Sequence, residues 1–351
     1  MPSRSDGRAL VARLRTSPWG MDTLAVPGAV FVVALILAGI AGSDSFLSPF
    51  NTSNVLVQIT PLILIALGQA FVIGSGGFDL SVGSIASLSA VVAATLFEPI
   101  GLVPALVAAL LAGLAVGLVN GLLVASGLEP FLVTLATLSV AQGVALIIRP
   151  TPGGTVPQGF TVIANYIGDI PVALPGVLLV AVLASAFLRT TRTGADILSV
   201  GGSPGVARLV GVKVNRTLVK TYLISAALAA LAGLFLVART RTGDPTIGAR
   251  FALDSIAAVI VGGTLLTGGR ITLVGTIIGS IALGLIPNVM NLAGISTFYQ
   301  TATKGVVLVA AILLPRLISR TVRHRRRATS ARTGPGVSLE RNLSHVPAGQ
   351  G

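Results

Sequence analysis

The chain is organised around the stretch Gly74-Ser75-Gly76-Gly77-Phe78-Asp79-Leu80-Ser81-Val82-Gly83-Ser84. This glycine-rich stretch carries one carboxylate and separates two long apolar runs, residues 55–73 and 85–97. A helix does not pass easily through several glycines, because each costs about 1 kcal/mol relative to alanine. If the flanking runs lie in lipid, the backbone groups freed at the break must face protein or a water-filled cavity. An ionisable residue there is costly, which makes Asp79 a candidate functional residue.

The composition is that of a membrane protein. Of 351 residues, 53% are hydrophobic and 10% are charged, and the mean hydropathy is +0.92. Soluble domains carry about 25% charged residues, and a helix needs about 20 apolar residues to cross a bilayer. We therefore expect an all-α integral membrane protein. The chain has no cysteine and only two histidines, so neither a disulfide nor a metal site is expected.

The net charge of +13 is concentrated in three segments. They are a basic arm at residues 1–20, a central loop at residues 189–220 and a basic tail at residues 320–351. The positive-inside rule places all three in the cytoplasm. The arm and the tail flank a membrane domain at residues 21–319, and the central loop lies within that domain. The tail is expected to be disordered. A nucleic-acid partner is not expected, because no basic module with interleaved aromatic residues is present.

The apolar runs predict about ten transmembrane helices with both termini in the cytoplasm. The long runs are residues 24–41, 55–73, 85–97, 102–125, 131–148, 172–188, 221–238, 273–292 and 302–318. Residues 255–266 are too few to cross a core about 30 Å thick. Because glycines interrupt and follow this segment, we expect a half-helix or re-entrant piece. Residues 149–171 are rich in proline and glycine and are expected to form an external loop.

The two halves of the membrane domain have similar content. Asp79 opens one span and Asp254 opens another that runs in the opposite direction, and each span is followed by a glycine-spaced helix that ends near an asparagine. This pattern is typical of an inverted five-plus-five repeat. In the first half, the glycines Gly113, Gly117 and Gly121 are expected to let two helix backbones approach closely.

Polar residues within these spans are the candidates for the translocation path or its gate: Asp79, Ser81, Asn120, Asp254, Asn288 and Asn291. Two interpretations stay open for each aspartate. The carboxylate either accepts hydrogen bonds from a solute or caps the following helix, in the case of Asp79 through the N–H of Ser81 or Val82. The asparagines either contact solute or hydrogen-bond between helices.

Several blocks, in order between residues 55 and 314, resemble the membrane permeases of ribose/xylose/galactose-type ABC sugar importers. They are Gly76-Gly77-Phe78-Asp79-Leu80-Ser81-Val82-Gly83-Ser84, Asn120-Gly121-Leu122-Leu123-Val124, Pro130-Phe131-Leu132-Val133-Thr134-Leu135-Ala136-Thr137, Leu253-Asp254-Ser255-Ile256-Ala257-Ala258-Val259 and Gly262-Gly263-Thr264-Leu265-Leu266-Thr267-Gly268-Gly269-Arg270. The resemblance implies a non-enzymatic inner-membrane subunit that pairs with a second permease, identical or not. It also implies a separate cytoplasmic ATPase, which uses the ATP, an extracytoplasmic sugar-binding protein, and no cofactor bound by this chain.

The central loop resembles the ATPase-facing element of that family at Gly201-Gly202-Ser203-Pro204-Gly205-Val206-Ala207-Arg208-Leu209-Val210-Gly211-Val212. From the residues alone, Pro204 is expected to open a short helix that ends near Gly211. The candidate coupling residues are Gly202, Ser203, Pro204, Ala207, Arg208, Leu209 and Gly211. The family usually has an acidic residue at the position of Gly205 and another near Ala252, and Phe78 stands where isoleucine is common.

A second class of function stays open from the residues alone. No lysine lies in a phosphate-binding loop motif, so ATP hydrolysis would have to come from another subunit. An ion-coupled secondary transporter with discontinuous helices would need no such partner, and Asp79 would then serve the coupling ion. A membrane-bound enzyme is not indicated, because no paired carboxylates and no histidine or cysteine cluster are present.

Overall fold

The computed structural model describes residues 21–40 and 45–296, and beyond these residues 298–300, 302–303, 305–306 and 309. The expected basic arm (1–20) and tail (320–351) lie outside the described residues, as does most of the expected last span (302–318). All the described residues belong to one unit of the chain, residues 1–311.

The described residues are mostly helical. The longer helices are α2 (Met21–Ile40), α3 (Pro49–Gly74), α4 (Val82–Ile100), α5 (Leu102–Ala125), α6 (Pro130–Ile148), α8 (Ala173–Thr190), α11 (Val214–Thr240) and α13 (Leu273–Leu292). The shorter ones are α7 (Gln158–Thr161), η1 (Val162–Ala164), α9 (Arg192–Gly202), α10 (Pro204–Leu209) and α12 (Phe251–Val261). Two-residue strands β1 (Tyr166–Ile167) and β2 (Ile170–Pro171) pair antiparallel in the loop before α8.

Seven of the described helices are long and apolar enough to cross a membrane: α3, α4, α5, α6, α8, α11 and α13. The expected class, an all-α membrane protein, is therefore confirmed. The total of about ten spans and the inverted repeat remain predictions. Helices α5 and α13 have the bounds expected from the sequence. Helix α3 begins earlier than expected, at Pro49, because Ser48 accepts a hydrogen bond from the N–H of Asn51 and proline suits a first helical position.

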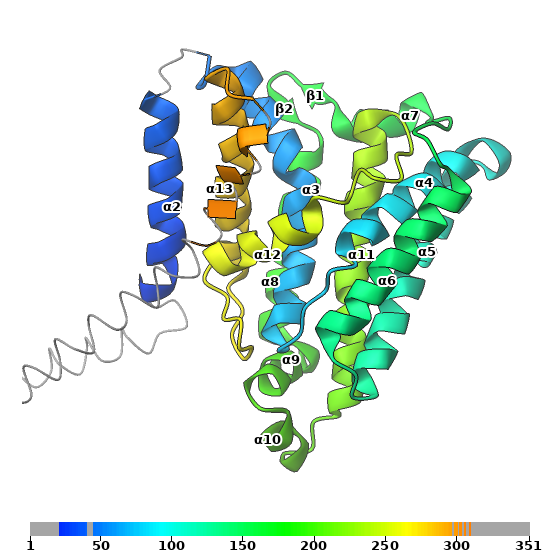
Figure 1. The fold of residues 1–351 in the computed structure, drawn as a ribbon, viewed down its shortest axis with the longest axis vertical. Helices are drawn as coiled ribbons and strands as arrows, with labels where there is room; N and C mark the ends of the chain where they lie inside the picture. Colours follow the sequence, from blue (N-terminus) through cyan, green and yellow to red (C-terminus); the bar gives the residue numbers. More distant parts are fainter. Residues whose placement is uncertain are drawn as a thin grey trace, which may run out of the picture. The chain divides into compact units, whose positions relative to one another are not determined.

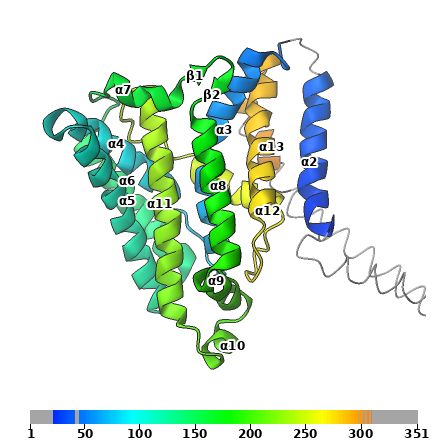
Figure 2. The same ribbon diagram turned by 180° about the vertical axis from the view of Figure 1, so that it is seen from behind.

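Helix α11 packs against α3, α4 and α5, as Figure 1 and the reverse view in Figure 2 show. The glycines of α5 face α11. A Cβ added at Gly121 would lie 2.7 Å from the Cα of Val219, and one added at Gly113 would lie 2.8 Å from the Cβ of Ala230. The expected close approach of two helix backbones is confirmed. Helix α6, by contrast, exposes most of its apolar side chains, and α8 exposes Leu178, Leu179, Val182 and Leu183.

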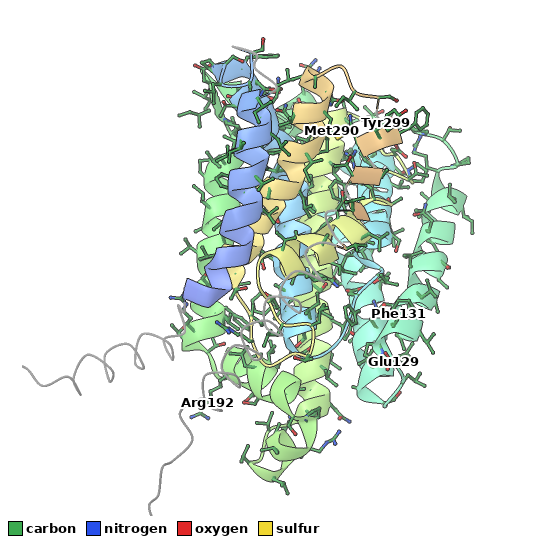
Figure 3. The ribbon with its side chains drawn as sticks, turned by 60° about the vertical axis from the view of Figure 1, so that its left-hand side comes forward. Glu129, Phe131, Arg192, Met290 and Tyr299 are labelled. Atoms are coloured by element: carbon green, nitrogen blue, oxygen red, sulfur yellow. The ribbon has the colours of Figure 1, made fainter. Side chains whose placement is uncertain are left out.

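The helix ends separate into two groups. Figure 3 shows Arg192, at the start of α9, at the same end of the helices as Glu129 and Phe131, with Met290 and Tyr299 at the opposite end. We name the end that carries α9 and α10 the basic end, after the basic residues Arg189, Arg192, Arg208, Lys213, Arg216 and Lys220. From the sequence, the turn before α6 and the central loop are expected on the same side of the membrane. The structure has both at the basic end, in agreement with this expectation.

Two expected segments differ from the structure. The central loop at residues 189–220 contains two helices, α9 and α10, and α11 already begins at Val214. The short segment expected at residues 255–266 is α12, Phe251–Val261, and the residues from 262 to 272 that follow it are not helical. The glycines Gly263, Gly268 and Gly269 have positive φ there, which prevents the helix from continuing.

Candidate functional site

The break between α3 and α4 is sheltered by protein. Residues 75–81 are not helical, and Gly76 has a φ of +88°, which favours glycine. Next to it, a Cβ at Gly77 would lie 2.8 Å from the hydroxyl of Tyr222. That hydroxyl donates to the carbonyl oxygen of Phe78 at 3.1 Å. A backbone group that is freed at the break, the carbonyl oxygen of Phe78, therefore faces protein, which was one of the two expected surroundings.

The carboxylate of Asp79 is fully buried and accepts three hydrogen bonds. Its Oδ1 accepts from the N–H of Ser81 at 3.0 Å and from the hydroxyl of Ser81 at 2.6 Å. Its Oδ2 accepts from the hydroxyl of Ser225 on α11 at 2.9 Å. Asp79 has an exposed fraction of 0%. The bond to the N–H of Ser81 is the one expected of a capping aspartate, although Ser81, not Asp79, is the residue immediately before α4.

Further side chains extend this arrangement across the helices. Asn120 of α5 donates to the hydroxyl of Ser81 at 2.8 Å. The hydroxyl of Thr137 on α6 donates to Oδ1 of Asn120 at 2.6 Å. Gln69 of α3, in the amide orientation that satisfies both groups, donates to the carbonyl oxygen of Asp79 at 3.0 Å and accepts from its N–H at 3.2 Å. We name Asp79, Ser81, Asn120, Thr137, Ser225 and Gln69 the Asp79 network.

The network brings three of the six candidates together. Asp79, Ser81 and Asn120 are each completely buried, and they hydrogen-bond to one another and to neighbouring residues of the chain. Gln69, like the asparagines, is expected from the sequence either to contact solute or to hydrogen-bond between helices, whereas Thr137 and Ser225 are candidates that the sequence does not single out. A contact of this network with solute stays a prediction.

A second turn of the same kind precedes α12. Oδ1 of Asp244 accepts from the N–H of Thr246 at 2.7 Å and from its hydroxyl at 2.8 Å. These are the contacts that Asp79 makes with Ser81. The shared signal is an aspartate, any residue, a hydroxyl residue, a branched apolar residue and glycine: Asp79-Leu80-Ser81-Val82-Gly83 and Asp244-Pro245-Thr246-Ile247-Gly248. The two turns also touch, because a Cβ at Gly83 would lie 2.6 Å from the carbonyl oxygen of Gly248.

Asp254, which the sequence analysis paired with Asp79, has a different place. It lies in the first turn of α12, which begins at Phe251, so it does not precede the helix. The helix starts early because the preceding turn already provides its geometry, with the N–H of Phe251 donating to the carbonyl oxygen of Gly248 at 2.9 Å. A carboxylate in a first turn favours the positive end of the helix dipole. In its hydrogen bonds, the turn at Asp244 resembles the turn at Asp79.

The two asparagines of α13 lie apart from the Asp79 network. Asn288 forms a reciprocal amide pair with Asn51 of α3, with N···O distances of 3.2 and 2.7 Å. Asn51 is near the start of α3 and the break follows its end, a separation of about 35 Å at 1.5 Å per residue. Asn291 is exposed and accepts from the side chain of Gln300 at 2.6 Å. The six candidates therefore do not form one site, because Asp254, Asn288 and Asn291 lie outside the Asp79 network.

The short helix expected to open at Pro204 is confirmed as α10, and its role in coupling to an ATPase stays a prediction. Pro204 is its first residue, and the hydroxyl of Ser203 accepts from the N–H of Val206 at 3.4 Å. Gly211, just after the helix, has a φ of +85°. Ala207 is buried in a cluster with Val200 of α9 and Val214 of α11. At the tip, Leu209 and Val210 are 87% and 73% exposed. Gly202 and Arg208 are exposed as well.

Comparison with known proteins agrees with these features. The family model described as a branched-chain amino acid transport system permease component matches residues 51–314. The ribose import permease protein RbsC of Bacillus subtilis is 41% identical over 293 residues, 82% of this chain and 90% of its own. RbsC of Escherichia coli is 35% identical over 314 residues, which cover 86% of this chain and 96% of the length of RbsC.

The allose transport system permease protein AlsC of Escherichia coli is 34% identical over 305 residues, which cover 84% of this chain and 92% of its own. No solved structure matches the chain. The family match extends over most of the described helices and includes both turns and α10. The chain is a multi-pass membrane protein and belongs to the permease-component family of ABC transporters, with sugar-import permeases among its relatives.

Proposed function

We propose that this chain is the membrane subunit of an ABC importer for a monosaccharide of the ribose, xylose or galactose class. Family membership and relatives that import ribose and transport allose support this assignment. In this proposal two permease copies form the path in the inner membrane, an extracytoplasmic binding protein delivers the sugar, and a cytoplasmic ATPase supplies the energy. Both chain termini lie in the cytoplasm.

The exposed tip of α10 is the observation that carries the proposal. Val206, Leu209 and Val210 present apolar surface to solvent outside the helices that could span a membrane. Exposed apolar side chains surrounded by polar and basic residues mark an interaction surface. The basic residues around them support a cytoplasmic location for this end, the side on which the proposed ATPase would act. We assign the tip to docking of the ATPase.

Co-purification of the ATPase tests this assignment. A charge placed in the contact by Leu209→Asp would have to be desolvated on docking, so the ATPase should be lost from the purified complex. The matched control is Leu128→Asp, at a 52% exposed position in the turn before α6, which should retain the ATPase. If Leu209→Asp retains the ATPase as well as this control does, the docking surface has been misplaced.

The ion-coupled secondary transporter is not favoured. A coupling ion needs a carboxylate oxygen that it can reach, and both oxygens of Asp79 are occupied by hydroxyl and N–H donors. The side chain is also closed to solvent. The relatives that the chain matches are permease components, in agreement with a power source on another subunit.

A further inference from the structure

Three backbone segments that carry glycines meet at the basic end. The N–H of Gly269 donates to the carbonyl oxygen of Gly74 at 2.9 Å. A Cβ added at Gly201 would overlap that same carbonyl oxygen and would lie 2.6 Å from the nitrogen of Gly269. A Cβ at Gly268 would lie 2.6 Å from the carbonyl oxygen of Gly201. We name this contact of Gly74, Gly201 and Gly268–Gly269 the glycine junction.

Each member of the junction belongs to a different part of the molecule. Gly74 is the last residue of α3 and precedes the break that holds Asp79. Gly268 and Gly269 belong to the non-helical segment at residues 262–272, after α12. Gly201 is the penultimate residue of α9. The α9–α10 pair therefore touches both interrupted regions of the membrane domain directly.

The α9–α10 pair is packed as one piece. Ile197 and Val200 of α9 are 0% and 1% exposed, and Val200 shares a cluster with Ala207 of α10. A displacement of the α10 tip is therefore carried to the end of α9. At the junction the contacts are between backbones, so no side chain can rotate to absorb that displacement, and packed interfaces move between discrete arrangements.

We propose that Gly201 is the positioning residue through which movement of the α9–α10 pair reaches the Asp79 break and the segment at residues 262–272. This role rests on the proposed function, because it assumes that an ATPase moves α10. It assigns no contact with solute or nucleotide to Gly201. The residue acts only through the backbones that it touches.

The first test is Gly201→Ala in the full complex of permease, ATPase and binding protein. The added methyl group forces the three backbones apart, so sugar-loaded binding protein should no longer stimulate ATP hydrolysis, and uptake should fall by about tenfold. The ATPase should still co-purify, and unstimulated hydrolysis should persist. The matched control is Gly176→Ala in α8, where an added Cβ meets nothing within 4 Å. Stimulation and uptake equal to this control would overturn the proposal, and so would loss of the ATPase.

A second pair of variants decides the question if Gly201→Ala does not accumulate in the membrane. The three atoms nearest to a Cβ at Gly74 would all belong to the side chain of Ile271. Gly74→Ala should therefore push the segment at residues 262–272 away from α3 and lower stimulated hydrolysis and uptake. Gly74→Ala/Ile271→Ala removes the clash and should restore both. Unchanged activity in the single variant, or no rescue in the double variant, contradicts the linkage.

The unmodified complex distinguishes failure of the proposed function from failure of the role of Gly201. If it shows no ATP-dependent uptake of any pentose or hexose, the proposed function fails. If it transports sugar and the junction variants do so equally well, only the role of Gly201 fails.

Discussion

Ser225 of α11 donates its hydroxyl to Oδ2 of Asp79 at 2.9 Å, although 146 positions separate the two residues. The break after α3 is therefore held from the second half of the chain and not only by its own helix start. Asn120 of α5 reaches the same turn through Ser81. The turn is thus fixed where α3, α4, α5 and α11 meet, and a change in their packing would move it.

Replacement of Asp79 by asparagine should reduce uptake more than it reduces insertion into the membrane. The amide keeps one acceptor oxygen for Ser81, and the hydroxyl of Ser225 can turn to accept from the amide nitrogen, so the fold should persist. The turn is nevertheless altered by about one hydrogen bond, so we expect uptake to fall by about tenfold, which corresponds to 1.4 kcal/mol. Asp169→Asn, at an exposed position, is the control. Normal uptake by the Asp79 variant would show that this carboxylate only caps the following helix and has no role in transport.

Asn120 and Thr137 should be energetically coupled. Either Asn120→Ala or Thr137→Val breaks the 2.6 Å bond between α5 and α6, and each should lower the free energy of unfolding by about 1–3 kcal/mol. Thermal unfolding of the purified protein in detergent measures both. In the double variant the losses should be less than additive, because the two residues share one network. Strict additivity would show that the bond contributes nothing.

The close approach of α5 and α11 should tolerate no added methyl group at Gly117. A Cβ there would overlap the Cβ of Ala226 and lie 2.9 Å from the carbonyl oxygen of Tyr222, and overpacking of this kind costs about 1–3 kcal/mol. The melting temperature of Gly117→Ala should therefore fall. Gly143→Ala in α6 meets nothing within 4 Å, so its melting temperature should be unchanged or higher. Equal melting temperatures would contradict the packing of these two helices.

Asn288 should act in stability rather than in recognition of sugar. Asn288→Ala removes the donor to Oδ1 of half-buried Asn51, whose amide nitrogen keeps its bond to the carbonyl oxygen of Phe46, so stability should fall by about 1 kcal/mol. The KM of uptake should stay the same, since this pair lies far from the Asp79 network. An increase in KM at unchanged stability would instead return Asn288 to the translocation path.

The sequence was sufficient for the features that local chemistry determines. The break at residues 75–81 follows from its glycines, and α10 follows from Ser203 and Pro204 at its start. Helix α5 keeps its expected bounds because Gly101 precedes it and the turn at Ser126-Gly127 follows it. In each case a residue at the boundary has a backbone preference that no distant contact overrides.

Distant contacts account for what was missed. The partners of Asp79 come from helices far along the chain, so no pattern in residues 74–84 identifies Ser225 or Asn120. Helix α9 was expected to be a loop, although Gly194, Ile197 and Val200, buried at three-residue spacing, were a visible helical signal. The apolar run that begins after Asp254 favours Asp254 as the residue that matches Asp79, whereas the turn motif shared with Asp79 lies at Asp244.

Transport by purified components in sealed vesicles tests the central claim most directly. The account predicts uptake of a monosaccharide only when the permease is reconstituted with its ATPase and binding protein and ATP is supplied on the side of the basic end. Permease alone, in vesicles that carry a proton or sodium gradient, should accumulate no sugar. Gradient-driven uptake by the permease alone, with no ATPase present, would contradict the account.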